Sequence, residues 1–105
     1  MINILNARVI KIIGTKFPHL RNMIRNHPYS KVVGMGVVKC LIEDMHMPQE
    51  KITDALLEEM IDKGIALYHE NEEEIKKIPV LEHKRRVLCD HLRQIATEYI
   101  QANAS

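Results

Sequence analysis

The sequence has few aromatic residues: no Trp, one Phe and three Tyr among 105 residues. Ile, Leu, Val and Met side chains must therefore fill the interior of any fold. Hydrophobic residues make up 46% of the chain, which is too many for an intrinsically disordered protein. A chain of this length suits one domain, so we expect residues 1–105 to form a single unit.

Long hydrophobic runs are also absent. The longest, residues 32–38, contains two glycines and falls far short of the roughly 20 residues of a membrane-spanning helix. The N-terminus lacks the apolar region and cleavage site of a secretory signal. The only two cysteines, Cys40 and Cys89, lie far apart in the sequence, so we expect reduced thiols and a cytoplasmic protein.

No familiar catalytic or cofactor motif occurs in the chain. There is no P-loop, and the residues 34–36 (Gly-Met-Gly) lack the third glycine and the βαβ context of a dinucleotide-binding fingerprint. We therefore expect no cofactor and lean toward a protein that is not an enzyme.

Acidic residues are missing from the first 42 positions, which carry seven basic side chains. Residues 43–74 then carry eleven acids against two lysines, and residues 75–105 carry six bases against three acids. Three explanations are open. In the first, basic and acidic elements pair inside the fold. In the second, a basic face binds nucleic acid or membrane lipid. In the third, the basic part of one copy meets the acidic part of another.

Helical periodicity dominates the apolar pattern and predicts an all-α bundle of four to five helices. In the first segment Ile2, Leu5, Val9 and Ile12 recur every three or four residues, and Gly14 is placed to end that helix in a left-handed cap. Pro18 then begins a short second helix.

Residues 30–42 are the ambiguous segment. Ser30 is a plausible N-cap, and a helix here would be apolar nearly all round, with Gly34 admitting a close neighbour. Valines favour a strand, whereas the two glycines weaken a helix. We prefer a helix, and a strand would instead make the fold α+β.

The second half of the chain contains three predicted helices. Pro48 starts the first, whose stripe includes Leu56 and Met60, and Gly64 bends or ends it. Asn71 followed by three glutamates starts the second. The third, about 80–102, has the most regular apolar spacing of the three.

Six histidines raise the possibility of a metal site. Glu43 and His46 have the E-x-x-H spacing of di-iron bundles, but the motif occurs once. A tetrahedral zinc site could also draw on Cys40, His46, His83, Cys89 and His91, yet no C-x-x-C or H-x-x-x-H is present. Solvated histidines and buried thiols are the favoured interpretation, so we predict no metal.

Arg86 and His91 have an R-x4-H spacing that resembles the ribonuclease motif of HEPN helical bundles. The resemblance implies that the imidazole acts as general acid or base and that the guanidinium stabilises charge on the phosphate. It covers six residues, and Val87 stands where that motif has a polar residue. A HEPN-like ribonuclease is the enzymatic alternative.

Basic residues also suggest an anion-binding surface. The candidates are Arg21, Arg25, Lys31, Lys84 and Arg85, which could bind phosphates if the fold joins them. No aromatic residue interleaves these bases, so stacking on single-stranded nucleic acid is poorly supported. A nucleic-acid-binding protein remains an alternative.

Segregated charge, the apolar segment at 32–38 and the missing catalytic motifs together favour a non-enzymatic protein-interaction or regulatory module. We predict a homodimer, with an unknown protein partner steered by an acidic surface. The acidic candidates for partner binding are Glu58, Glu59, Asp62, Glu70, Glu72, Glu73 and Glu74.

Overall fold

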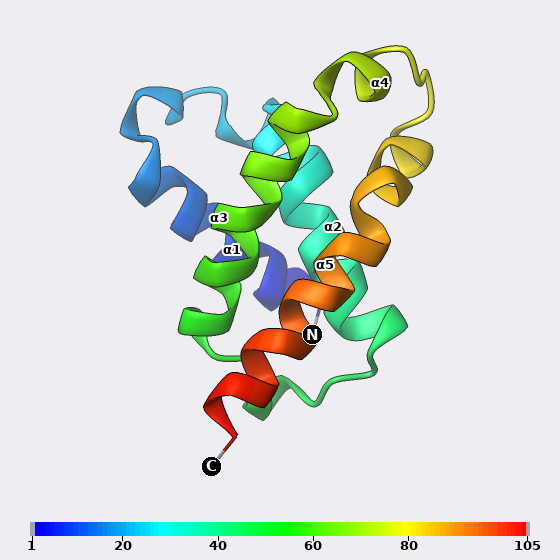
Figure 1. Ribbon diagram of the computed structural model, residues 1–105. Coiled ribbons are helices and arrows are strands. Elements are labelled where there is room, and N and C mark those ends of the chain that lie inside the picture. The colour runs from blue at the N-terminus through cyan, green and yellow to red at the C-terminus, as the bar shows by residue number, and fades with distance from the viewer. Residues whose placement is uncertain (1, 105) are drawn as a thin grey trace.

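The computed structural model describes residues 2–104 and confirms the predicted all-α bundle (Figure 1). Its α-helices are α1 (Ile2–Lys16), α2 (Met35–Lys39), α3 (Asp54–Glu70), α4 (Glu72–Lys76) and α5 (Leu81–Asn103). Two π-helical segments, Tyr29–Gly34 and Cys40–Asp44, extend α2 at both ends. Short 3-10 turns lie at Pro18–Leu20, Ile24–Asn26 and Gln49–Lys51, and no strand occurs within residues 2–104. Side chains are described from residue 4 onward, so the inward position predicted for Ile2 lies outside the described residues.

The ambiguous segment is helical throughout, which rules out the α+β alternative. Residues 29–44 form one continuous element, here called the central helix, that packs against α1, α3 and α5. Val33, Val37 and Leu41 are completely buried in it. Gly34 admits a close neighbour as predicted, because a Cβ there would lie 2.9 Å from Cγ1 of Val9.

The start of the central helix corrects the prediction for Ser30. This residue lies inside the first turn and its buried hydroxyl makes no hydrogen bond. His27 takes the capping position instead, because the following Pro28 keeps it extended, at φ −76° and ψ 144°. Its Nδ1 accepts a hydrogen bond from the backbone N–H of Tyr29 at 3.2 Å.

Three other helix boundaries differ from those predicted. The first helix continues through Gly14, whose φ is not positive, and ends just before Pro18. Pro48 starts only a 3-10 turn, whereas α3 begins after Thr53, whose Oγ1 accepts the N–H of Leu56 at 3.1 Å. Gly64 does not end α3 but lies buried inside it, where a Cβ would meet the side chains of Val33 and Leu92.

The remaining predictions for the second half are confirmed. α4 follows Asn71, and α5 begins and ends within one residue of the predicted range. α3 and α5 lie side by side and run in opposite directions (Figure 1). Their buried side chains, with those of α1 and the central helix, form one continuous apolar core. Within residues 2–104, no helix combines the length and hydrophobicity needed to cross a membrane.

Candidate functional site

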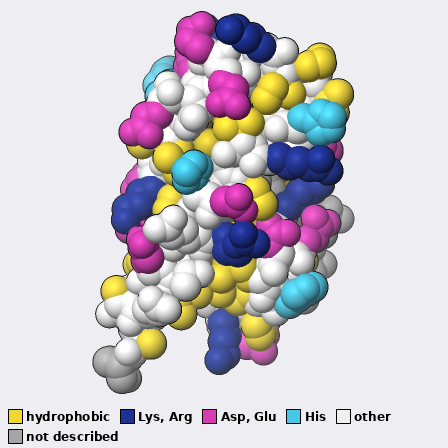
Figure 2. Space-filling model, turned by 45° about the vertical axis from the view of Figure 1, so that its right-hand side comes forward, with side chains coloured by type: hydrophobic (Ala, Val, Ile, Leu, Met, Phe, Trp, Pro, Cys, Tyr) yellow, Lys and Arg dark blue, Asp and Glu magenta, His cyan; other side chains and the backbone are white. Residues whose placement is uncertain are grey.

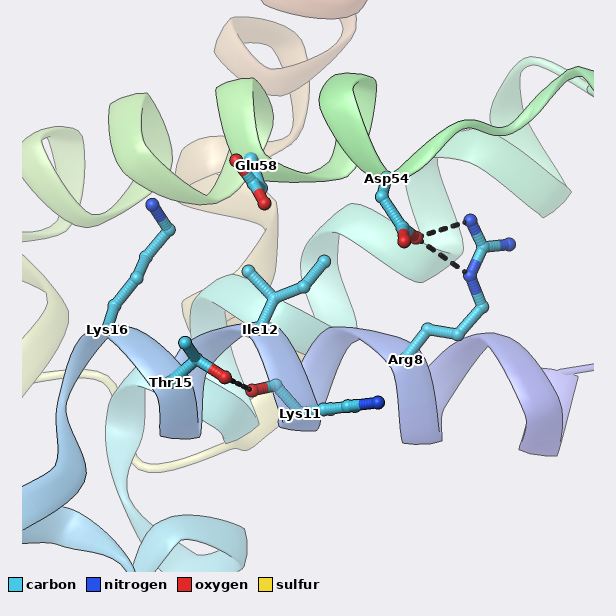
Figure 3. A pocket seen from close by; sticks show the side chains of 7 residues that line it. All are labelled: Arg8, Lys11, Ile12, Thr15, Lys16, Asp54 and Glu58. Atoms are coloured by element: carbon cyan, nitrogen blue, oxygen red, sulfur yellow. Dashed lines mark hydrogen bonds and ion pairs between the residues drawn. The ribbon is translucent and has the colours of Figure 1, made fainter.

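Two ion pairs between α1 and α3 join the basic and acidic parts of the chain, and Figure 3 shows the first of them, Arg8 with Asp54. Nη2 of Arg8 lies 2.8 Å from Oδ1 of Asp54, and Nε of the same guanidinium donates to that oxygen at 3.2 Å. Two turns further along both helices, Nζ of Lys16 lies 2.9 Å from Oδ1 of Asp62. The matching offset shows that α1 and α3 run parallel. Partly exposed pairs of this kind contribute about 0–1 kcal/mol each, so they orient the helices more than they stabilise them.

A third ion pair connects the basic N-terminal part of the chain to α5. Nζ of Lys39 lies 2.7 Å from Oε2 of Glu82, and this hydrogen bond lowers the pKa of the Glu82 carboxyl. Basic and acidic side chains also lie next to one another on the face shown in Figure 2. Two of the seven bases in residues 1–42, Arg8 and Lys16, thus pair with acids of residues 43–74, and a third, Lys39, pairs with Glu82 of α5.

The acidic residues predicted to bind a partner fall into two groups. Lysines bind four of them: Lys16 pairs with Asp62, Lys63 with Glu59, and Lys76 with both Glu72 and Glu73. Among the described residues, no basic group lies within ion-pair distance of Glu58, Glu70 or Glu74. These three carboxylates have no internal ion pair that a binding partner would have to break.

One of them, Glu70, lies at a groove between α3 and α5 with a volume of about 330 Å³. We call it the α3–α5 groove; its lining residues are Lys63, Ala66, Leu67, Glu70, His91, Gln94, Ile95 and Glu98. Ala66, Leu67 and Ile95 form an apolar floor, and Glu70 and Glu98 place negative charge at the rim. Lys63 also lines the groove; its Nζ lies 2.8 Å from Oε2 of Glu59, and the hydrogen bond to Glu59, with the charge of Glu98, raises the pKa of its ammonium group.

Sequence analysis did not identify Ile95 and Glu98 as site residues. The available signal was the spacing of His91, Ile95 and Glu98, which places them on one face of a helix. That spacing shows a shared face but not which neighbour α5 packs against.

The structure does not bring Arg86 and His91 together in this groove. Both side chains are exposed. His91 lines the groove, whereas Arg86 does not. Five residues at 100° per residue place them about 140° apart around the axis of α5. The HEPN-like ribonuclease stays a prediction that rests on the spacing alone.

The histidines and cysteines considered as metal ligands lie in several places. Glu43 is exposed near the end of the central helix, and His46 follows it with a left-handed φ of 50°. Burial, with the negative charge of Asp44, raises the pKa of the Cys40 thiol to about 12, so it remains protonated at neutral pH. Cys89 donates a hydrogen bond to Oδ2 of Asp44 at 3.1 Å. Within residues 2–104, no three His, Cys, Asp or Glu side chains are grouped closely enough to hold a metal ion.

The predicted anion-binding residues are only partly brought together. Lys31 and Lys84 line one pocket between the central helix and the α4–α5 connection. Arg85 lies beside them, and its Nε donates to the backbone oxygen of Lys31 at 2.9 Å. Arg21 and Arg25 are exposed between α1 and the central helix and do not line this pocket.

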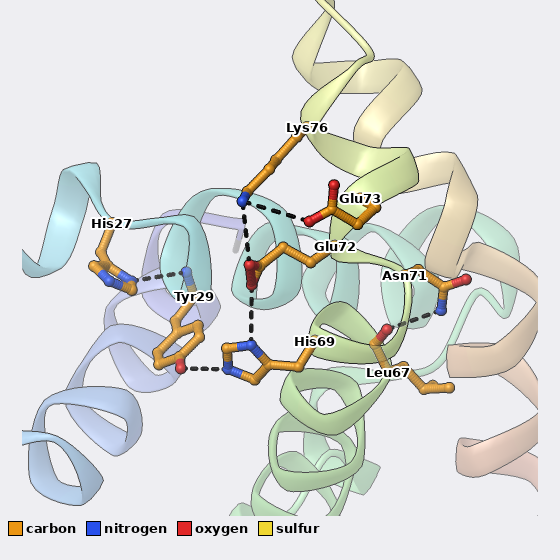
Figure 4. A network of polar contacts seen from close by, with 8 residues as sticks. All are labelled: His27, Tyr29, Leu67, His69, Asn71, Glu72, Glu73 and Lys76. Atoms are coloured by element: carbon orange, nitrogen blue, oxygen red, sulfur yellow. Dashed lines mark hydrogen bonds and ion pairs between the residues drawn. The ribbon is translucent and has the colours of Figure 1, made fainter.

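A polar network joins the start of the central helix to α3 and α4 (Figure 4). The hydroxyl of Tyr29 lies 2.6 Å from Nε2 of His69, and Nδ1 of His69 lies 3.2 Å from Oε1 of Glu72. The rings of Tyr29 and Tyr68 meet edge to face, with centroids 6.2 Å apart. Burial, with the charges of His19 and His69, lowers the pKa of the neighbouring His27. These contacts fasten the loop before the central helix to the body of the bundle.

Comparison with known proteins assigns no family. No family model matches the chain, and no curated protein sequence or solved structure matches it. Any function must therefore be inferred from the grooves, charges and contacts described above.

Proposed function

We propose that this protein is a non-enzymatic interaction module that self-associates through its charged surfaces. In this proposal, the outer face of α1 from one copy lies in the α3–α5 groove of another copy. The observation that carries the proposal is the match between an apolar helix face with a basic residue and an apolar groove with an acidic rim. We also propose that the protein is cytoplasmic. Both of its cysteines, Cys40 and Cys89, are free thiols, as expected in that reducing compartment.

The donor surface is the side of α1 that faces away from the core. Ile4 is the most exposed of the large hydrophobic residues described, with 57% of its surface accessible. Ala7 and Lys11 are also exposed and follow it at spacings of three and four, which places all three on one helix face. Together with Arg8 they line a shallow, largely apolar hollow. This face thus presents an apolar stripe that ends in a lysine.

The groove offers the apolar and acidic groups that match the apolar and basic side chains of that face. A helix that lays its apolar side into a groove between two helices is a common mode of protein recognition. Ile4 and Ala7 would contact the floor formed by Ala66, Leu67 and Ile95. Lys11 would then approach Glu70, while Glu98, at the opposite end of the groove beside Lys63, adds to the negative charge that steers the encounter.

Every copy carries both the donor face and the groove, so a symmetric dimer contains two identical contacts. Two contacts of this kind bury more apolar surface than either would alone. Because part of the attraction is between charges close to water, we expect the dimer to weaken as the salt concentration rises.

Sedimentation velocity tests this proposal on the untagged protein. We expect a dimer for the wild type and a monomer for the double variant Glu70→Lys, Glu98→Lys, which reverses the charge of the rim. Glu74→Lys is the matched control, because this exposed carboxylate lies outside the groove, and it should remain dimeric. A monomeric wild type, or a double variant as dimeric as Glu74→Lys, would contradict the proposal.

A further inference from the structure

We propose that the protein has a second binding site, for a small organic anion with an apolar body, in the pocket that Lys31 and Lys84 line. This site is separate from the α3–α5 groove and goes beyond the proposed self-association. The pocket has a volume of about 280 Å³, close to the lower end of pockets that bind small molecules. Its lining residues are Pro28, Lys31, Val32, Tyr68, Ile75, Lys76, Pro79, Leu81 and Lys84.

The wall of this pocket is apolar and is held by the core. Val32, Tyr68 and Ile75 come from three different elements and are almost fully buried, with 3%, 9% and 1% of their surfaces exposed. Pro28 and Pro79 border the pocket, and the proline ring fixes the backbone φ at each position. An apolar group can therefore enter a cavity that already exists.

Positive charge gathers at the edge of the same pocket. Nζ of Lys84 donates to the backbone oxygen of Ile75 at 2.7 Å, which holds the ammonium in place and leaves it two further N–H donors. Lys76 is drawn toward Glu72 and Glu73 at 3.6 and 3.8 Å. Among residues 2–104, no carboxylate lies within ion-pair distance of Lys31 or Lys84. These two ammonium groups are available to an external anion.

The two properties together define the ligand class. A bare inorganic anion would satisfy the lysines but leave the apolar wall empty, whereas a neutral apolar molecule would leave the ammonium groups without a partner. A carboxylate or phosphate on a short aliphatic or aromatic body satisfies both. Charge-assisted hydrogen bonds to the lysines would set its orientation, and burial of its body would add affinity.

Titration calorimetry with three probes of the same chain length tests this inference: octanoate, octanol and octylammonium. We expect octanoate to bind, octanol to bind about tenfold or more weakly because it lacks charged hydrogen bonds, and octylammonium not to bind. Inorganic phosphate should bind far more weakly than octanoate. Equal binding of octanoate and octanol, or no binding of octanoate, would overturn the inference.

Lysine variants locate the binding. Lys31→Gln and Lys84→Gln should each weaken octanoate binding several-fold, and the double variant should weaken it about tenfold or more, toward the affinity of octanol. Lys77→Gln is the control, since Lys77 follows α4 directly and is exposed but does not line the pocket. Lys31 makes no side-chain hydrogen bond among the described residues, so its substitution should leave the fold intact even if Lys84→Gln destabilises it. If Lys31→Gln binds octanoate as tightly as Lys77→Gln does, the inference is wrong, whatever the result for self-association.

Discussion

The bare backbone of Gly64 in α3 faces the side chain of Val33 in the central helix. A Cβ at position 64 would lie only 2.8 Å from Cγ1 of Val33 and 3.2 Å from Cδ2 of Leu92 in α5. Val33 and Leu92 are both fully buried and have little room to move. Gly64 is therefore a point at which three helices approach one another closely, and its lack of a side chain is what permits their packing.

Gly64→Ala should destabilise the protein by up to about 2 kcal/mol. Alanine favours a helix by about 1 kcal/mol over glycine, but overpacking a core costs about 1–3 kcal/mol. Gly14→Ala is the control, because a Cβ there meets nothing within 4 Å, and it should stabilise by about 1 kcal/mol. Urea unfolding of both variants measures the difference. Two stabilised variants would show that α3 is not packed this closely.

Replacement of His46 by glycine should stabilise the protein. His46 has φ 50°, the left-handed conformation that strains residues other than glycine, and it lies where the central helix ends. We expect His46→Gly to raise the free energy of unfolding by about 1 kcal/mol, and His46→Ala to give no such gain, because alanine keeps the strain. If the two variants are equally stable, the backbone is not left-handed at this position.

Stability should fall as the pH is lowered below about 6.5, in part because of His27. Burial and the nearby His19 and His69 lower the pKa of His27 in the folded protein. Between the pKa of the unfolded chain and this lower value, the unfolded state binds more protons, so acid favours unfolding. His27→Asn retains a hydrogen-bond acceptor for Tyr29 but does not titrate. Its free energy of unfolding should therefore depend less on pH between about pH 7 and pH 5 than that of the wild type. An identical dependence would contradict this role.

Variants of His91 and Arg86 separate the interaction module from the ribonuclease alternative. His91→Ala should raise the dissociation constant of the dimer several-fold, because His91 lines the α3–α5 groove, whereas Arg86→Ala should leave it unchanged. The ribonuclease alternative instead requires both residues for cleavage of RNA. Sedimentation and incubation with single-stranded RNA, carried out on both variants, measure the two properties. RNA cleavage by the wild type that both variants lose would favour the enzyme.

The sequence predicted the helices whose apolar spacing is regular and failed where tertiary contacts decide. α5 lies within one residue of its predicted range because its stripe agrees with helical periodicity along its whole length. Gly14 and Gly64 resembled helix ends in the sequence, but both lie inside helices. Pro48 resembled a helix start, yet Thr53 provides the cap that begins α3. A local pattern cannot show which of two nearby capping residues the packing of the chain will use.

The candidate sites were harder to predict than the fold because each combines residues from distant segments. Segregated charge left such pairing open as one of three explanations, and only the register of α1 against α3 decides that Arg8 meets Asp54. Lys31 and Lys84 were both candidates for anion binding, and only the fold brings them to one pocket. Glu98 was not predicted as a partner-binding residue because it lies outside the acidic segment at 43–74.

A charge-swap mixing experiment tests the proposed self-association most directly. Lys11→Glu places an acid on the donor face, and the double variant Glu70→Lys, Glu98→Lys places bases on the rim of the groove. Each should sediment alone as a monomer, because its donor face and its groove carry like charges. An equimolar mixture should form a heterodimer, since each variant's donor face is then opposite in charge to the other's groove. Monomers that persist in the mixture, or variants that dimerise alone as the wild type does, would contradict the proposal.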